Sequence, residues 1–516
     1  MKNGPWFLGI DLGTGSCKSV VVDEKGRVLG FGIGLYGGTD PESRWQEQDP
    51  RNLMTAAAVS VQGALTRADV ARGACLGLSM GGALHSILAL DSRDNPLTGV
   101  ITWADGRGLH HAEALRGGST AIRLYQETGC PVHGMYPLYK IMWLREKRPE
   151  VFRATHRYVT AKEYVFSQFT GQFAVDYSLA AGSGLLNARR LRWSDSALEL
   201  AGIREGQLSP LLSPAAAQGS LKPDVAHRLG IPESTPVVIG SSDAVNSSVG
   251  AGAVSASQAT CMIGTSGALR VISGRPVFDE NGRTWCYAID EKHWLVGGAI
   301  NNGGIAVSWL KDSLGPVMPP ARSPGELSIE HILDLAGQVP AGAEGVVCLP
   351  FFAGERSPNW NLNARGVFFG LTLEHDIRHL SRSILEGIGF RFRSLQDALA
   401  GIGLDIRQIL ASGGFAKSEL WLQIVTDALN REMTVPRWSE TSALGAAFWA
   451  MLGAGCLDSI DTAGNLVEQG KTYRPIPENA ALYNQVYTVY LKIYQALLSA
   501  FDEAALMQAI LPSTNA

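Results

Sequence analysis

The chain is organised around one stretch near its start, Leu8-Gly9-Ile10-Asp11-Leu12-Gly13-Thr14-Gly15-Ser16-Cys17-Lys18-Ser19-Val20-Val21-Val22. An apolar run, a group of small residues and a second alternating apolar run predict a β-hairpin with a glycine-rich turn. Such a turn suits a phosphate group, because glycines let a ligand approach the backbone and N–H and hydroxyl groups act as donors. The candidate phosphate contacts are Gly13, Thr14, Gly15, Ser16 and Lys18, and Asp11 is the candidate ligand of a hydrated Mg²⁺. A Gly-Thr-Gly turn between strands is also common as a plain tight turn.

A related pattern returns halfway along the chain, in the segment Ala259 to Ile272. Here too an apolar strand leads into small residues and a second apolar strand follows. The phosphate candidates of this second turn are Gly264, Thr265 and Ser266. Two such hairpins, one in each half of the chain, predict two similar domains that bind one nucleotide.

Length and composition narrow the class of protein. A chain of 516 residues predicts two or three domains, and 46% hydrophobic with 18% charged residues is typical of a globular protein with sizeable cores. The net charge of only −4 argues against a nucleic-acid or membrane-surface partner, so small molecules are the expected ligands. The seven cysteines are widely spaced, which indicates neither a disulfide framework nor a zinc site. Without an apolar leader or a run long enough to span a membrane, we expect a cytoplasmic protein, and a homodimer is left open.

Strands alternate with helical patterns after the first hairpin, which favours an α/β domain. The polar residues of this region gather near the predicted strand ends, where α/β sheets usually bind their ligands. They include His85, next to Leu84, and the group Trp103, Asp105 and Arg107. Taken singly, His85 and Trp103 are best explained as core residues with satisfied polar atoms. Lys140 begins an amphipathic helix, where a lone lysine is usually solvated.

Asp243 is the candidate with the clearest local setting. The apolar run from Pro236 leads into Gly240, Ser241 and Ser242, and the small residues leave room for a substrate beside the carboxylate. An Asp that follows a strand is most often a helix cap.

Two further glycine-rich turns lie in the second half of the chain. The first, 297–304, contains Gly303 and is explained equally well by a surface turn and by contact with adenosine. The second contains Gly413, Gly414 and Lys417; it connects an apolar strand to a helix start, whose free N–H groups can bind a ligand. The Pro- and Gly-rich segment 314–328 is predicted to be a surface loop. From Pro477 onward, a terminal helix is expected to pack on the core through Leu482, Val486, Val489, Ile493, Leu497 and Ala500.

The two hairpins resemble the phosphate loops of the actin-like ATPase superfamily, and the rest of the chain is similar to its FGGY carbohydrate kinase branch. The segments that carry the likeness are 84–107, 240–244, the Glu-Arg-Ser-Pro-Asn-Trp-Asn run 355–361, and 412–418. The resemblance implies an α/β protein with two actin-like (ribonuclease H-like) domains and an interdomain cleft. The expected domains are 1–248, with the sugar site and the first phosphate loop, 249–456, with the second phosphate loop and the adenosine motif, and a helical segment 457–516 that packs on the core.

The same resemblance assigns roles to the candidates. Asp243 matches the catalytic base and a possible second metal contact beside Asp11. The implied sugar contacts are Leu84, His85, Trp103, Asp105, Arg107, Lys140 and Asp243, and the implied adenosine contacts are Gly303, Gly413, Gly414 and Lys417. In the family the His85 position has different neighbours, and many members carry Asn where Lys417 stands.

The implied reaction is transfer of the γ-phosphoryl group of ATP, with Mg²⁺, to a terminal hydroxyl of a sugar or sugar acid. The form of segments 84–105 and 355–361 is most similar to members that phosphorylate gluconate, and Arg107, Lys140 and His85 are the cations that could pair with its carboxylate. The alternatives are a kinase for another open-chain sugar or polyol such as xylulose, and a sensor without catalytic activity. A sensor would have no need of the carboxylate at Asp243. Walker A and His-Arg-Asp motifs are absent from the sequence.

Overall fold

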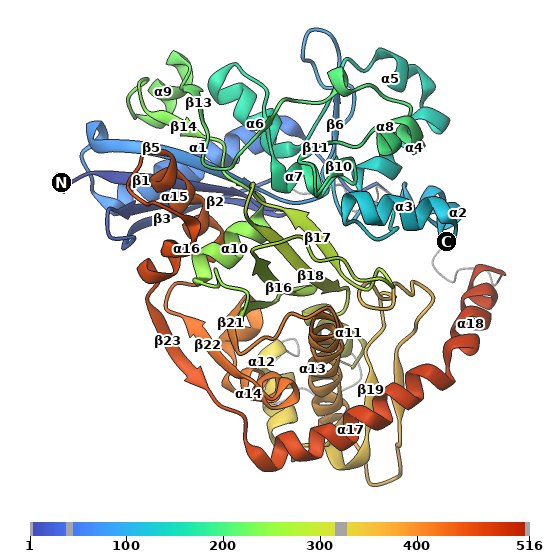
Figure 1. The fold of residues 1–516 in the computed structure, drawn as a ribbon. Helices are drawn as coiled ribbons and strands as arrows, with labels where there is room; N and C mark the ends of the chain where they lie inside the picture. Colours follow the sequence, from blue (N-terminus) through green and yellow to red (C-terminus); the bar gives the residue numbers. More distant parts are fainter. Residues whose placement is uncertain (1–3, 38–44, 315–327, 511–516) are drawn as a thin grey trace. The chain divides into compact units, whose positions relative to one another are not determined.

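The structure is a computed structural model that describes residues 4–37, 45–314 and 328–510, so most of the predicted loop 314–328 lies outside the described residues. The chain forms two compact units. Unit 1 comprises Met1–Ala256, Val271–Val296 and Glu440–Glu468, and unit 2 comprises Ser257–Arg270, Gly297–Ser439 and Gln469–Ala516. Each unit is built on its own β-sheet with helices packed against it (Figure 1).

These units differ from the three consecutive segments predicted from the sequence. Residues 440–456 belong to unit 1, because helix α15 (Thr441–Gly453) packs on strands β1 and β5 and on helix α10 of that unit. The predicted segment 457–516 is divided as well: its residues up to Glu468 lie in unit 1, and the remainder lies in unit 2.

The sheet of unit 1 contains six strands in the order β13-β14-β5-β1-β2-β3. Their bounds are β1 Trp6–Leu12, β2 Ser16–Asp23, β3 Val28–Leu35, β5 Cys75–Gly82, β13 Ala217–Ser220 and β14 Pro236–Val238. Strands β1, β2 and β3 are antiparallel neighbours, whereas β1, β5 and β14 run parallel. The predicted first hairpin is therefore present, and it leads into a mixed α/β sheet.

Short strand pairs and helices complete unit 1. The pairs are β4 (Glu47–Gln48) with β7 (Val100–Ile101), β6 (Leu88–Leu90) with β8 (Arg157–Val159), β9 (Val175–Asp176) with β12 (Leu211–Leu212), and β10 (Leu186–Asn187) with β11 (Arg192–Trp193). The helices are α1 Pro50–Ala68, α2 Leu109–Leu115, α3 Ser119–Thr128, α4 Pro137–Lys147, α5 Pro149–Ala154, α6 Ala161–Thr170, α7 Tyr177–Ala181, α8 Asp195–Ala201, α9 Pro223–Leu229, α10 Asp243–Ala251, α15 and α16 Ile460–Ala463; strand β17 (Trp285–Ala288) also belongs to this unit.

Helices cover both faces of the sheet because the side chains of β1 alternate. Trp6, Leu8 and Ile10 join the core that includes α1, whereas Gly9 faces α15. A Cβ atom on Gly9 would lie 2.1 Å from the carbonyl oxygen of Ala443, so only glycine allows α15 to approach this closely. Asp11 is on the same face of β1 as Gly9.

The strands β15, β21, β22 and β23 of unit 2 are consecutive neighbours in its sheet. The elements of this unit are β15 Gln258–Ile263, β19 Val347–Leu349, β20 Val367–Phe369, β21 Gln408–Ser412, β22 Glu432–Pro436, β23 Gln469–Tyr473, α11 Gly304–Leu314, α12 Ile329–Gly337, α13 Ile377–Gly401, α14 Glu419–Leu429, α17 Pro477–Ala496 and α18 Leu498–Ile510. Strands β16 (Gly267–Ser273) and β18 (Trp294–Ile300) have residues in both units. The second predicted hairpin is thus formed by β15 and β16.

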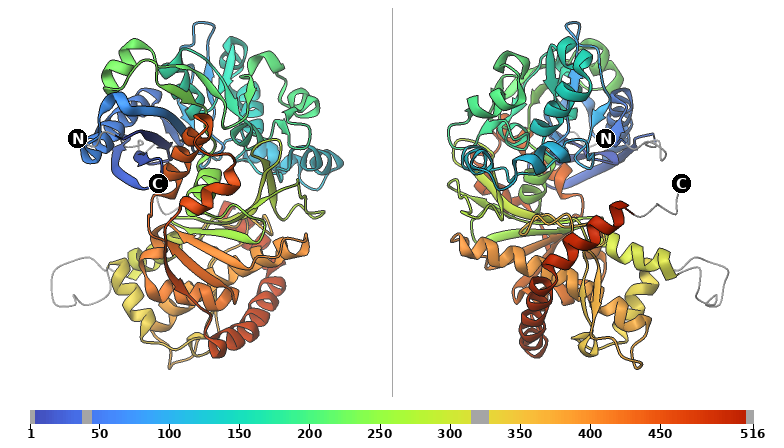
Figure 2. Two further views of the ribbon diagram at one scale, coloured as in Figure 1. Left: turned by 60° about the vertical axis from the view of Figure 1, so that its left-hand side comes forward. Right: turned by 90° about the vertical axis from the view of Figure 1, so that its right-hand side faces the viewer.

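The predicted terminal helix exists and packs on the core, but the predicted buried face is only partly correct: Ile493 is buried, and Val486 and Leu497 pack against the core while partly exposed. Leu482 and Val489 are 37% and 41% exposed, and a neighbouring stripe of tyrosines is buried instead. That stripe comprises Tyr483, Tyr487, Tyr490 and Tyr494 of α17. The helix axis also changes direction where α17 passes into α18 (Figure 2). Among the described helices, none is both long enough and apolar enough to cross a bilayer.

Candidate active site

The first glycine-rich turn has the geometry of a tight hairpin loop. Asp11 of β1 lies opposite Lys18 of β2 in the antiparallel register. The Gly13 N–H donates to the Ser16 carbonyl at 3.1 Å. Thr14 and Gly15 are exposed at the tip. Lys18 forms an ion pair of 2.6 Å with Glu440, which directly precedes α15. The turn is therefore open to a ligand, with one partly exposed cation at its base.

Asp11 and Asp243 form a pair of interacting carboxylates in unit 1. Asp11 is 7% exposed, and its Oδ1 atom has no hydrogen-bond partner within residues 4–37, 45–314 and 328–510. Burial, and then the nearby charge of Asp243, raise the pKa of Asp11 to about 7. Gly81 keeps the space beside Asp11 open, because a Cβ there would lie 3.2 Å from Oδ1.

This arrangement fits a divalent cation. Two adjacent carboxylates repel each other unless a positive charge lies between or beside them, and carboxylate oxygens are the protein ligands that Mg²⁺ prefers. The unpaired buried oxygen of Asp11 is an available ligand atom. The residues predicted to hold Mg²⁺ are thus brought together by β1 and the start of α10.

Asp243 is the first residue of helix α10. The preceding Ser242 caps the helix by accepting from Val245 N–H, so Asp243 itself is not the cap. Asp243 is partly exposed, and its Oδ1 accepts from the Ala244 N–H at 2.7 Å. A carboxylate in the first turn interacts favourably with the helix dipole, which supports the ionised form that a base requires.

A series of buried hydrogen bonds fixes the backbone at Ser242, the residue directly before Asp243. The Ser242 N–H donates to Ser178 Oγ at 2.8 Å, and the Ser178 hydroxyl donates to Asp176 Oδ1 at 2.5 Å. Asp176 is also paired with Lys162 at 2.5 Å, and both side chains are fully buried. Removing one partner of such a pair leaves an uncompensated buried charge. These hydrogen bonds and the ion pair therefore anchor the start of α10 to α6 and α7.

The segment around His85 is fixed by two of the predicted sugar contacts. His85 has φ of +66° and its Nδ1 donates to the Gly182 carbonyl at 2.6 Å. Lys140 is fully buried, and its ammonium donates to the carbonyls of His85 and Thr102, both at 2.7 Å. Desolvation lowers the pKa of Lys140 to about 7. Leu84, beside His85, is partly exposed and faces Gly182.

Arg107 is surrounded by two carboxylates and two aromatic rings. Its Nε is 2.8 Å from Asp105 Oδ1, and its Nη1 is 2.7 Å from Glu47 Oε1. The guanidinium lies over the rings of Trp45 and Trp143, at 4.8 and 5.0 Å from their centroids. Its Nη2 is buried and has no hydrogen-bond partner in the described part of the chain. The Arg107 charge is therefore already matched by two carboxylates, and the Nη2 group remains for a ligand.

Trp103 connects this region to the phosphate turn. Its indole Nε1 donates to Thr14 Oγ1 at 3.1 Å, and Gln48 Nε2 donates to the Thr14 carbonyl. The first glycine-rich turn is therefore in direct contact with Trp103 and Gln48 within unit 1.

In unit 2, the predicted nucleotide residues come together around a pocket of about 360 Å³. Gly264, Thr265, Gly414 and Lys417 are among its lining residues. The turns beside them pack backbone to backbone: Gly304 N–H donates to the Gly264 carbonyl at 2.7 Å. The other candidates are adjacent to this contact, because a Cβ on Gly303 would lie 2.7 Å from the Ser266 carbonyl oxygen and one on Gly413 would lie 2.5 Å from that of Ile263.

Sequence reasoning missed the partners of the candidates. The sequence offered no reason to select the ion-pair partners Glu440, Glu47, Asp176 and Lys162. Each of them either lies far along the chain from its partner or has no local motif around it. The Thr-x-x-Glu capping box at Thr160–Glu163 marks the start of α6 and was the only local signal near Lys162.

Residues 6–250 match the N-terminal domain of the FGGY family of carbohydrate kinases, and residues 259–454 match its C-terminal domain. The chain is 35% identical to the gluconokinase of Bacillus subtilis (strain 168) over 510 residues, 97% of this chain and 98% of that protein. A structure of gluconate kinase and one of ligand-bound xylulose kinase, both from Lactobacillus acidophilus, each superpose with a TM-score of 0.90 at 30% identity, covering 97% of this chain and 99% of theirs.

Proposed function

Because this chain belongs to the FGGY family of carbohydrate kinases, we propose that it transfers the γ-phosphoryl group of ATP to a terminal hydroxyl of gluconate, giving 6-phosphogluconate and ADP. The observation that carries the chemistry is the Asp11 and Asp243 pair beside an open phosphate turn. The 35% identity to a gluconokinase over nearly the whole length supports gluconate as the substrate.

Asp243 acts as the general base in this proposal. Its partly exposed carboxylate accepts the proton of the sugar hydroxyl as that oxygen attacks the γ-phosphorus. The bond between the γ-phosphorus and the bridging oxygen breaks, and ADP leaves with the electron pair. The buried contacts that connect Lys162, Asp176, Ser178 and Ser242 keep the start of α10 in place during this step.

The phosphate turn and Lys18 supply donors for the negative charge that develops on the phosphoryl oxygens. Asp11 and Asp243 are the residues that would hold Mg²⁺, which would supply positive charge to neutralise the phosphates when bound. In unit 2, the pocket next to Gly264 and Gly414 is the proposed site for adenosine. Its glycines admit a flat base and ribose close to the backbone.

Xylulose is the second candidate substrate. The structure of a xylulose kinase superposes on this chain as well as the structure of a gluconate kinase does, with the same TM-score and identity. The fold therefore favours neither substrate, and the choice of gluconate depends on the sequence comparison and on the cation at Arg107.

A substrate panel tests this choice. ADP release is measured with Mg²⁺ and ATP on gluconate, xylulose, glycerol, ribulose and rhamnulose. We expect the highest kcat/KM with gluconate. A higher kcat/KM with xylulose would make xylulose, not gluconate, the preferred substrate. If none of the five compounds supported ADP release, the proposed activity would be overturned.

The base assignment is tested by Asp243→Asn. Loss of a general base typically lowers kcat by about 10²-fold to 10⁴-fold, with ATP binding retained. Asp195→Asn is the matched control, because Asp195 is also the first residue of a helix behind a capping serine, but it is exposed at α8. Comparable turnover in the two variants would exclude Asp243 as the base.

A further inference from the structure

The second glycine turn, Gly264 to Ser266, is held by the segment 301–305 that follows strand β18. The backbone N–H groups of residues 303–305 all donate to carbonyls of this turn, at distances between 2.7 and 3.2 Å. Gly304 also lines the pocket of unit 2 that is the proposed nucleotide site. The position of the segment 301–305 therefore determines where the second glycine turn lies.

The loop 353–357 fixes this segment in turn. Asn302 is fully buried, and its side chain accepts a backbone N–H of the loop at 2.9 Å and donates to a backbone carbonyl of the loop at 2.7 Å. The backbone N–H of Asn301 donates to Glu355 Oε1 at 3.2 Å. A displacement of the loop would therefore move the segment as well.

Glu355 is a fully buried carboxylate within this loop. Its Oε1 accepts from the backbone N–H groups of Asn301 and Arg356, and its Oε2 lies 3.0 Å from Nε of the buried Arg391. Arg391 also donates from Nη2 to the Ser357 carbonyl at 2.9 Å. Hydrogen bonds to ionised groups are shorter and stronger than neutral ones. One ion pair thus connects the backbone of the segment to helix α13.

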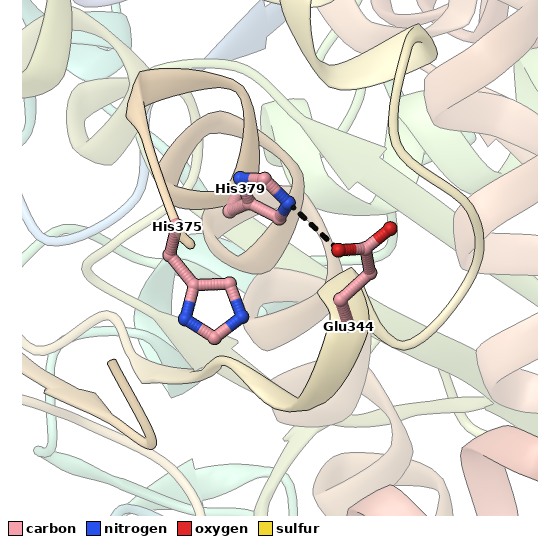
Figure 3. A group of neighbouring side chains, drawn as sticks. All are labelled: Glu344, His375 and His379. Carbon is pink, nitrogen blue, oxygen red and sulfur yellow. Dashed lines mark hydrogen bonds and ion pairs between the residues drawn. The ribbon is translucent and has the colours of Figure 1, made fainter. Parts of the chain in front are cut away.

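Helix α13, which carries Arg391, is fixed at its start. The backbone N–H of Asp376 donates to His379 Nδ1 at 3.0 Å, so in the neutral ring the proton is on Nε2. This Nε2 lies 3.2 Å from Glu344 Oε2, and Figure 3 shows the carboxylate facing it. The start of the helix is therefore joined to the turn that contains Glu344, and α13 provides a fixed support for Arg391.

We propose that Glu355 and Arg391 are positioning residues for ATP, because their buried ion pair holds the segment 301–305, and through it the second glycine turn, in place for the nucleotide. The inference rests on the proposed nucleotide site in unit 2. Neither side chain is among the described residues that line the pocket, so both act on ATP through the backbone. The sugar candidates lie in unit 1 and should not respond to a change in this ion pair.

The test compares two buried carboxylates of unit 2 that each pair with an arginine of α13. Glu355→Gln removes the charge that contacts Asn301, whereas Glu386→Gln removes the charge that pairs with Arg382 at 2.7 Å. Both variants should have a lower melting temperature, because each leaves a buried arginine uncompensated. Calorimetry with ATP and Mg²⁺, below both melting temperatures, should give a Kd at least about tenfold higher in Glu355→Gln alone, because small displacements of positioned groups are costly. The Kd for gluconate should be unchanged in both variants.

Hydrogen exchange gives a second measurement, which a general loss of stability would change equally in the two variants. The amides of the segment 301–305 should exchange faster in Glu355→Gln and at the unaltered rate in Glu386→Gln. Unaltered ATP affinity in Glu355→Gln, or equal weakening in both variants, would overturn the proposal.

Glu355→Asp replaces Glu355→Gln if the latter does not fold. It keeps the charge beside Arg391 but withdraws the carboxylate from the Asn301 N–H, so ATP binding should again be weaker. Unaltered ATP affinity in Glu355→Asp would overturn the proposal. Failure of the unaltered chain itself to bind ATP would instead overturn the proposed function, and this inference with it.

Discussion

Asp11 is a buried carboxylate whose charge is opposed by Asp243 and by its own burial. Its pKa is raised from 3.8 to about 7, so in the metal-free protein it is protonated over much of the acidic range. The unfolded chain loses this proton at lower pH than the folded chain. The metal-free protein therefore loses stability as the pH rises from 3.8 to about 7, and a bound cation reverses this cost.

We predict that Mg²⁺ binding weakens below about pH 7, by about tenfold per pH unit at pH values well below the pKa, and is independent of pH above it. Calorimetric titration with MgCl₂ in two buffers of different ionisation enthalpy measures both the affinity and the proton released. Asp11→Asn should abolish the pH dependence together with most of the affinity. An unaltered pH profile in Asp11→Asn would show that another group titrates.

Arg107 is the residue through which the choice of an acid sugar can be tested. Two of its donors are held by Asp105 and Glu47, which leaves Nη2 for a substrate carboxylate. We predict that Arg107→Lys, which keeps the charge but loses the planar fork, raises the KM for gluconate at least about tenfold, equivalent to about 1.4 kcal/mol.

The KM for xylulose should change much less in this variant. Arg145→Lys is the control, because Arg145 is an exposed arginine of α4 that donates to a backbone carbonyl. Equal increases for gluconate and xylulose, with a lower melting temperature, would indicate that Arg107 only supports Glu47 and Asp105.

Among the secondary-structure elements, local sequence signals predicted the two glycine-rich hairpins correctly. They could not predict the contacts between elements that lie far apart along the chain. Apolar runs and glycines predicted both hairpins, because strand alternation and turn chemistry are local. The buried face of α17 was predicted only in part, because Tyr483 and Tyr487 have partners on α13 that no local pattern reveals. Tyr483 hydrogen-bonds to Arg382 and Glu386, and Tyr487 to Asp397.

Helix α10, which begins with the proposed base Asp243, packs directly against α15 within unit 1. A Cβ on Gly445 of α15 would lie 2.0 Å from the Asn246 carbonyl oxygen of α10, so the two backbones touch. We predict that Gly445→Ala displaces α10 and with it Asp243, lowering both the melting temperature and kcat. Overpacking of this kind typically costs about 1–3 kcal/mol.

Gly206→Ala is the control for this variant, because a Cβ at Gly206 meets no atom within 4 Å. Thermal melts and steady-state kinetics on both variants give the comparison. Wild-type melting and turnover in Gly445→Ala would show that the two helices tolerate separation.

Each of the two units carries a glycine turn of the same kind, Gly13 to Ser16 in unit 1 and Gly264 to Ser266 in unit 2. The two FGGY domain matches, 6–250 and 259–454, each contain one of these turns. Asp243 and the sugar candidates all lie in unit 1.

We predict that ATP binding depends on both turns. Thr14 and Thr265 are exposed, so Thr14→Leu and Thr265→Leu should fold normally while losing a phosphate donor. A hydrogen bond to a charged group is worth about 1.5–3 kcal/mol, so each change should weaken ATP binding at least about tenfold. Calorimetry with ATP measures this, and Thr55→Leu on the exposed face of α1 is the control. Gluconate binding serves as the second readout for Thr265→Leu alone, because Thr14 also accepts from Trp103, and it should be unchanged. If Thr265→Leu binds ATP as tightly as the unaltered chain, the second turn has no part in holding the phosphates, and the nucleotide contacts must be sought elsewhere in unit 2.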